Sequence, residues 1–151
     1  MMAAPPIGAS HPSLVVSNEL SELSRVSAWV EAWARQGGLP SMLVQIMDLC
    51  AMELVTNIIN YAYDGDSVHA IGLNLCKNED GRVSLEIEDD GRPFDPLQNA
   101  AQPSAKSLEE SRIGGWGLGI VRHFADELQY RRVDARNRLT VVFRHPDGTP
   151  H

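Results

Sequence analysis

The chain has 151 residues, 43% of them hydrophobic, which is enough for one domain with its own core. Its 13 Lys and Arg against 20 Asp and Glu give a formal charge of −7, which opposes non-specific binding to nucleic acid or anionic lipid. Two cysteines suit neither a disulfide framework nor a zinc site, and no signal-peptide pattern or apolar segment of membrane-spanning length is expected. We therefore expect a cytoplasmic protein whose partners are nucleotides or proteins.

Hydrophobic periodicity predicts the elements of one domain over residues 13–145, between a disordered N-terminal arm (1–12) and a C-terminal tail (146–151). The pattern gives a strand, two helices, a hairpin, a third helix and two last strands. Ser17-Asn18 is the expected cap of the first helix, and Gly37-Gly38 its end. The expected ranges are 13–17, 20–36, 40–62, 71–75, 83–87, 116–126, 128–133 and 139–144.

The last strand indicates how the sheet is covered. Leu139, Val141 and Phe143 share one side, with polar or smaller residues opposite, which predicts one covered face and antiparallel pairing. We expect an α+β two-layer sandwich with a mixed, mostly antiparallel sheet covered on one face by about three helices. Residues 96–113 show no sustained period and are expected to form a lid, because long loops in compact domains are usually functional or disordered.

Three polar motifs, in order along the chain, indicate a nucleotide site. The run Glu53-Leu-Val-Thr-Asn57 places a carboxylate and an amide one helical turn apart. The run Asp-Asp-Gly-Arg-Pro-Phe-Asp-Pro at 89–96 places an acid beside a glycine turn at the end of a strand. The run Gly-Gly-Trp-Gly-Leu-Gly at 114–119 opens a helix with small residues, whose free N–H groups and positive dipole end suit phosphate.

In this order and spacing, the motifs resemble those of the GHKL (Bergerat-fold) ATP-binding superfamily. The Asp-x-Gly-x-x-Phe-Asp-Pro form at 89–96 and the Gly-Gly-x-Gly-Leu-Gly-Ile run at 114–120 resemble its anti-sigma factor serine/threonine kinase branch. The resemblance extends over residues 14–145 and implies the Bergerat fold, with ATP or ADP and Mg²⁺ as cofactors.

The resemblance also implies residue roles. Glu53 would be the catalytic base that orients or deprotonates the attacking hydroxyl or water; the alternative is a carboxylate hydrogen-bonded to nearby backbone. Asn57 would be the magnesium ligand. Asp89 would accept the adenine amino group, and Gly91 would let the backbone approach the base, whereas ordinary turn chemistry is the alternative for both.

Further nucleotide contacts are implied along the loop, the third helix and the last strand. A structural role is the alternative for Phe94, an exposed loop position for Arg112, partner binding for Trp116, and an ordinary strand position for Thr140. The implied contacts are Phe94, Arg112, Gly115, Trp116, Gly117, Leu118, Gly119 and Thr140.

The function implied is that of an ATP-dependent protein serine/threonine kinase in a partner-switching system of transcription regulation. Its substrate would be a STAS-domain anti-anti-sigma protein, with a sigma factor or another regulator as second partner, and it would be a homodimer. The alternative is a nucleotide-gated binding module without relevant kinase activity, which the presence of both Glu53 and Asn57 disfavours. A detached histidine kinase catalytic domain is weaker still, since no dimerisation helices or phosphoacceptor histidine are recognised.

Overall fold

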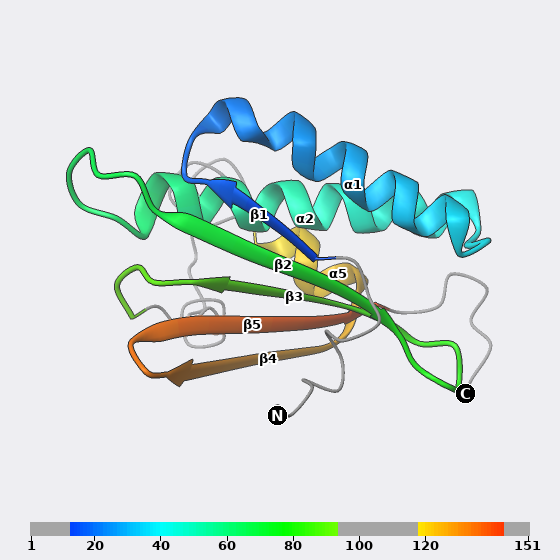
Figure 1. Cartoon of the computed structure of the whole chain (residues 1–151). Helices are drawn as coiled ribbons and strands as arrows, with labels where there is room; N and C mark the ends of the chain where they lie inside the picture. The colour runs from blue at the N-terminus through cyan, green and yellow to red at the C-terminus, as the bar shows by residue number, and fades with distance from the viewer. Residues whose placement is uncertain (1–12, 94–117, 144–151) are drawn as a thin grey trace, which may run out of the picture.

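A computed structural model describes residues 13–93 and 118–143. A layer of helices lies over one face of a five-stranded sheet (Figure 1). The elements are β1 (Ser13–Ser17), the 3-10 turn η2 (Leu20–Glu22), α1 (Leu23–Gln36), α2 (Ser41–Tyr61), β2 (Ala70–Lys77), β3 (Val83–Asp89), α5 (Leu118–Phe124), β4 (Ala125–Val133) and β5 (Arg136–Phe143).

The sheet has the strand order β1-β2-β3-β5-β4. Each of its four pairings is antiparallel, so the predicted α+β layer architecture is confirmed, whereas the mixed sheet is wrong for the described strands. The physical reason is that β2–β3 and β4–β5 are hairpins, and these two hairpins join through an antiparallel β3–β5 pairing.

The core lies between the covered face of the sheet and the helices. Inward-facing residues of the three central strands are buried, and they alternate with residues on the open face. On that open face Arg138 lies 3.8 Å from Glu86 and 3.6 Å from Glu88. The buried strand residues are Ile71, Leu73, Leu75, Val83, Leu85, Ile87, Leu139, Val141 and Phe143.

The start of α1 differs from the sequence prediction. The turn η2 precedes the helix, and Asn18 does not cap it; the Asn18 side chain donates to the Ser67 carbonyl and accepts from the His69 N–H. Tertiary hydrogen bonds between the end of β1 and the segment before β2 therefore displace the predicted cap. The predicted end is confirmed, with Gly37 at the C-cap and Gly38 at a φ of 72°.

The helix α2 forms the middle of the helical layer and packs against α1, α5 and β3. Its 21 residues, with a mean hydropathy of 1.6 over the most apolar window, reach the length and composition of a membrane span, which corrects the expectation that no segment would do so. In this fold α2 is a core helix, with residues such as Met47, Ala51 and Val55 fully buried. Cys50 is also buried, and Cys76 is half-buried.

The last two strands begin earlier than predicted. The helix α5 ends at Phe124, and β4 starts directly at Ala125 as an edge strand with many exposed polar residues, which weakened its sequence pattern. Asp134 and Ala135 form the turn to β5, with φ values of 53° and 64°. The predictions for residues 1–12, 96–113 and 146–151 lie outside the described residues.

The end of α2 meets the end of β3 at a close contact. The Arg92 N–H donates to the Ala62 carbonyl at 2.9 Å. A Cβ on Gly91 would lie 2.6 Å from both the Cβ and the carbonyl oxygen of Ala62. The absence of a side chain at position 91 therefore lets helix and strand approach.

We expect Gly91→Ala to lower the free energy of unfolding by about 1–3 kcal/mol, the usual cost of overpacking, because backbone atoms must move to admit the methyl group. Urea unfolding of the ligand-free protein measures this change. Gly72→Ala in β2 is the matched control, since a Cβ there meets nothing within 4 Å. Equal effects of the two substitutions would contradict the packing explanation.

Candidate functional site

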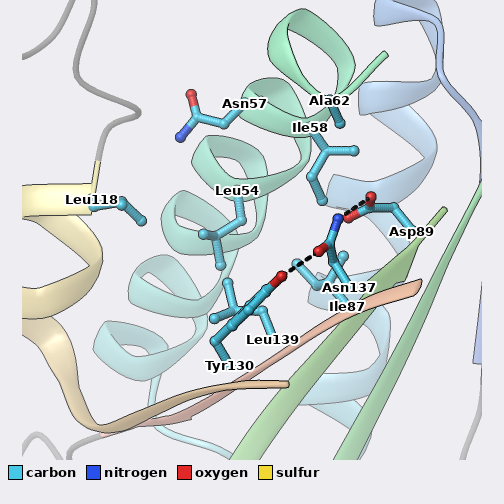
Figure 2. A pocket seen from close by; sticks show the side chains of 10 residues that line it. All are labelled: Leu54, Asn57, Ile58, Ala62, Ile87, Asp89, Leu118, Tyr130, Asn137 and Leu139. Atoms are coloured by element: carbon cyan, nitrogen blue, oxygen red, sulfur yellow. Dashed lines mark hydrogen bonds between the residues drawn. The ribbon is translucent and has the colours of Figure 1, made fainter. Parts of the chain in front are cut away.

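A pocket lies between α2, the start of α5, the end of β3 and the start of β5, with one residue from β4 (Figure 2). Most of its lining is apolar, and a few polar side chains enter it from different elements, as is typical of small-molecule sites. The lining residues are Leu54, Asn57, Ile58, Ala62, Ile87, Asp89, Leu118, Tyr130, Asn137 and Leu139.

Helix and strand periodicity explain how these side chains converge. On α2, Leu54, Asn57 and Ile58 are three and four residues apart and therefore share one face. In the sheet, Ile87 pairs with Leu139 and Asp89 with Asn137, so both pairs point to the covered side.

Asp89 is the buried acid of the pocket, with 4% of its surface exposed. Its Oδ1 accepts hydrogen bonds from the Gly91 N–H at 2.8 Å and from Asn137 Nδ2 at 3.0 Å. Burial raises the pKa of Asp89 above its usual value, and these two hydrogen bonds oppose the rise. Within the described residues both bonds fall on Oδ1, so Oδ2 is available to accept from a ligand.

Asn137 joins Asp89 to the neighbouring strands, and sequence reasoning missed it. Its Oδ1 accepts from the Tyr130 hydroxyl at 2.5 Å and from Arg132 Nη1 at 3.0 Å, while its Nδ2 also donates to the Arg92 carbonyl at 2.8 Å. The available signal was alternation: position 137 has the parity of Leu139, which places an amide on the covered face.

Asn57 lies on another side of the pocket from Asp89 and points toward the start of α5 (Figure 2). Its Nδ2 is buried without a hydrogen-bond partner in the described part of the chain. A buried amide lacking a partner costs about 1–3 kcal/mol, so this side chain fits a ligand with matching polar groups. Since residues 13–93 and 118–143 contain no group of three or more His, Cys, Asp or Glu that could hold a metal, an ion here would need water and ligand oxygens besides Asn57.

Glu53 lies one turn before Asn57 on α2 but does not line the pocket. Its negative charge is close to Cys50, whose thiol pKa is raised to about 12 by burial and, secondarily, by Glu53. The base role of Glu53 stays a prediction.

The structure brings Asn57, Asp89 and Leu118 together, with Gly91 bound to Asp89 beside the pocket. Gly119, the second residue of α5, is exposed. The predicted adenine contact of Thr140 is wrong: Thr140 pairs with Glu86 on the open face, and Leu139 points into the pocket instead. The remaining predicted contacts lie outside the described residues: Phe94, Arg112, Gly115, Trp116 and Gly117.

Residues 16–143 match the family model of the histidine kinase-like ATPase domain. The serine/threonine-protein kinase BtrW of Bordetella bronchiseptica is 37% identical over 114 residues, which are 76% of this chain and 80% of that protein. The anti-sigma F factor of Priestia megaterium is 32% identical over 93 residues, 62% of this chain and 63% of that one.

Solved structures share the fold. The crystal structure of the RsbU and RsbW domains of Rv1364c from Mycobacterium tuberculosis superposes with a TM-score of 0.59 at 17% identity, covering 88% of this chain and 32% of that one. The histidine kinase domain of the blue-light activated kinase EL346 from Erythrobacter litoralis gives a TM-score of 0.54 at 16% identity, over 85% and 61% of the two chains.

The burial of Asp89 predicts how stability depends on pH. Its pKa is higher in the folded than in the unfolded chain, so the folded state holds the proton to higher pH, and stability falls as pH rises from about 3.9 through the folded-state pKa. Asp90 adds to this rise and Arg132 opposes it. Asn at position 89 keeps an oxygen for both donors but has no proton to lose.

We therefore expect Asp89→Asn to raise the free energy of unfolding of the ligand-free protein relative to wild type. The difference should grow as pH rises from about 3.9 to the folded-state pKa of Asp89 and stay constant above it. Urea unfolding at several pH values between about 4 and 8 measures the difference. Asp80→Asn, in the exposed β2–β3 turn, is the control for the loss of one carboxylate outside the pocket. A difference that shrinks as pH rises would contradict the burial argument.

Proposed function

The chain belongs to the histidine kinase-like ATPase domain family, and on this premise we propose that it is an ATP-dependent protein serine/threonine kinase of a partner-switching system. The observation that carries the proposal is the pocket itself. A buried carboxylate with an available oxygen lies at one side. At another lies Asn57, whose buried Nδ2 has no hydrogen-bond partner within residues 13–93 and 118–143.

The two polar sides of the pocket suit the two ends of ATP. Asp89 Oδ2 would accept from the adenine amino group, while apolar Ile58, Ile87 and Leu139 form walls suited to a base. Asn57 points toward the start of α5, where the glycine run at 114–119 leads into the helix. Phosphates would lie on this side.

Asn57 fits Mg²⁺ because an amide oxygen is a hard ligand, and the unpartnered Nδ2 of the same side chain would donate to a phosphate oxygen or a bound water. Bound there, the ion would neutralise charge on the phosphates during transfer. Glu53, one turn earlier, would orient the acceptor hydroxyl and take its proton at the carboxylate. The core helix α2 would hold both groups in fixed relation.

The proposed substrate is a serine of a STAS-domain anti-anti-sigma protein. Relatives named as a serine/threonine kinase and as anti-sigma F factors support this choice. A phosphoryl group adds about 1.5–2 negative charges, enough to disrupt a packed interface and release the kinase for a sigma factor or another regulator. The charge of −7 favours protein partners over contact with nucleic acid.

A nucleotide-gated binding module is the second candidate function, because Glu53 does not line the pocket. Relatives named anti-sigma F factors support a sequestering role in either case. The two candidates differ in whether phosphate is transferred.

Substitutions on α2 distinguish these candidates. Glu53→Ala should keep Mg-ATP affinity within several-fold but lower the rate of phosphate transfer by about 10²–10⁴, the usual contribution of a general base. Asn57→Ala should also weaken Mg-dependent nucleotide binding. Labelled phosphate on each STAS-domain protein of the same genome, together with calorimetric nucleotide affinity, measures both effects.

Glu31→Ala on α1 is the control and should change neither quantity. Unchanged transfer by Glu53→Ala would remove its role as the base. Tight nucleotide binding without transfer to any STAS partner would favour the binding module.

We also propose a homodimer formed through β1. Among the described strands β1 is an edge of the sheet, hydrogen-bonded to β2 on one side, and its Val15 is 61% exposed. An apolar edge strand can extend a sheet across a two-fold axis. The occupant proposed is the same strand of a second copy.

Light scattering should report a dimer at tens of micromolar for the wild type, and Val15→Lys should give monomers because charge on an edge strand blocks edge-to-edge pairing. Val68→Lys, at another exposed apolar residue outside the sheet, is the control and should remain dimeric. A monomeric wild type would contradict the dimer.

A further inference from the structure

The amide of Asn137 is fully hydrogen-bonded in the interior beside the pocket, with 6% of the residue exposed. Two donors, the Tyr130 hydroxyl and Arg132 Nη1, reach its oxygen. Two acceptors, Asp89 Oδ1 and the Arg92 carbonyl, receive its Nδ2 protons. These four bonds use both lone pairs of the amide oxygen and both of its N–H donors.

These partners fix the orientation of the amide. Arg132 can donate and cannot accept, and a backbone carbonyl can accept and cannot donate. Rotation of the amide by half a turn would therefore place donor against donor and acceptor against acceptor. Asn137 consequently presents an N–H, and never an oxygen, to Asp89.

This fixed N–H determines what Asp89 can offer. Because the Asn137 and Gly91 N–H groups both bind Oδ1, they favour the ionised carboxylate and hold its plane. Asp89 lines the pocket, so its second oxygen would meet a ligand there as an acceptor only. A protonated Asp89 would offer a donor there instead.

We propose that Asn137 is a positioning residue for base selectivity, which fixes Asp89 as an acceptor and thereby selects a purine with a 6-amino group over one with a 6-oxo group. The inference rests on the proposed nucleotide function. It assigns to Asn137 a part in choosing the base, beyond joining β5 to the Gly91–Arg92 turn.

Two substitutions remove the N–H in different ways. Asn137→Asp keeps size and the acceptor for Tyr130 and Arg132, but places a second carboxyl against Asp89, so that the pair must hold a proton. Asn137→Ala removes the N–H without adding charge. Asp90 and Arg132 are the other charged groups that act on Asp89, and both remain in each variant.

The test is calorimetric binding of ADP and IDP with Mg²⁺ to the full chain, since IDP differs in carrying a 6-oxo group. Wild type should prefer ADP by about tenfold or more, the value of one hydrogen bond to a charged group. Both variants should lose most of this preference, chiefly through weaker ADP binding. Asn78→Asp, in the β2–β3 turn at the far end of β3, is the matched control and should keep the wild-type ratio.

A second readout is the pH dependence of ADP affinity. Without the Asn137 N–H the pKa of Asp89 rises further, so Asn137→Ala should lose ADP affinity at higher pH than wild type as pH falls. The ADP to IDP affinity ratio describes the folded molecules, because an unfolded fraction lowers the fitted binding stoichiometry and leaves the dissociation constants unchanged. If both substitutions prevent folding, Tyr130→Phe is a milder variant, because Arg132 still donates to the amide oxygen. It should lower the ADP to IDP affinity ratio less.

The outcomes separate the two proposals. Selective ADP binding by wild type with the same ADP to IDP ratio and pH profile in the Asn137 variants would overturn the role of Asn137 and leave the nucleotide function standing. Absence of binding of either nucleotide to wild type would overturn both.

Discussion

A buried carboxylate, Asp89, is the constraint on which the pocket depends. Ionised acids are unfavourable away from water unless donors face them, and here each donor comes from a different part of the chain. Gly91 supplies one from the turn after β3, and Asn137 supplies another from β5. The close approach of that turn to Ala62 at the end of α2 completes the junction. Burial of this ionised carboxylate therefore depends on the pairing of β3 with β5, on the position of the α2 end and on the glycine at position 91.

The helix α2 combines packing with chemistry. Its buried residues form much of the core, and the same helix carries Glu53 and Asn57 near its end. Groups on a core helix keep their relative positions better than groups on loops, which suits the phosphate-orienting role proposed for this site. A substitution on the apolar face of α2 would therefore disturb both stability and alignment.

Much of the fold could be predicted from the sequence, because α2, β2 and β3 have regular apolar periods. Asn57 and Asp89 could be placed because each belongs to a motif on a well-patterned element. Asn137 was missed because β5 begins three residues before the predicted start, among charged neighbours. Thr140 was assigned by resemblance, against the alternation that places it opposite Leu139 and Val141. The prediction that Asn18 caps α1 is wrong because its side chain hydrogen-bonds instead to the Ser67 carbonyl and the His69 N–H, which are distant in sequence.

The two-residue turn at Asp134 and Ala135 carries a consequence for how such a domain can vary. Both residues adopt left-handed backbone angles, which match the twist of the β4–β5 ribbon and set its register. One inserted residue that slipped β5 against its neighbours would exchange its two faces, because strand side chains alternate. An arginine, Arg136 or Arg138, would then face Asp89 in place of the amide. The length of this turn therefore decides which face of β5 meets Asp89, and insertions should be tolerated elsewhere on the surface before they are tolerated here.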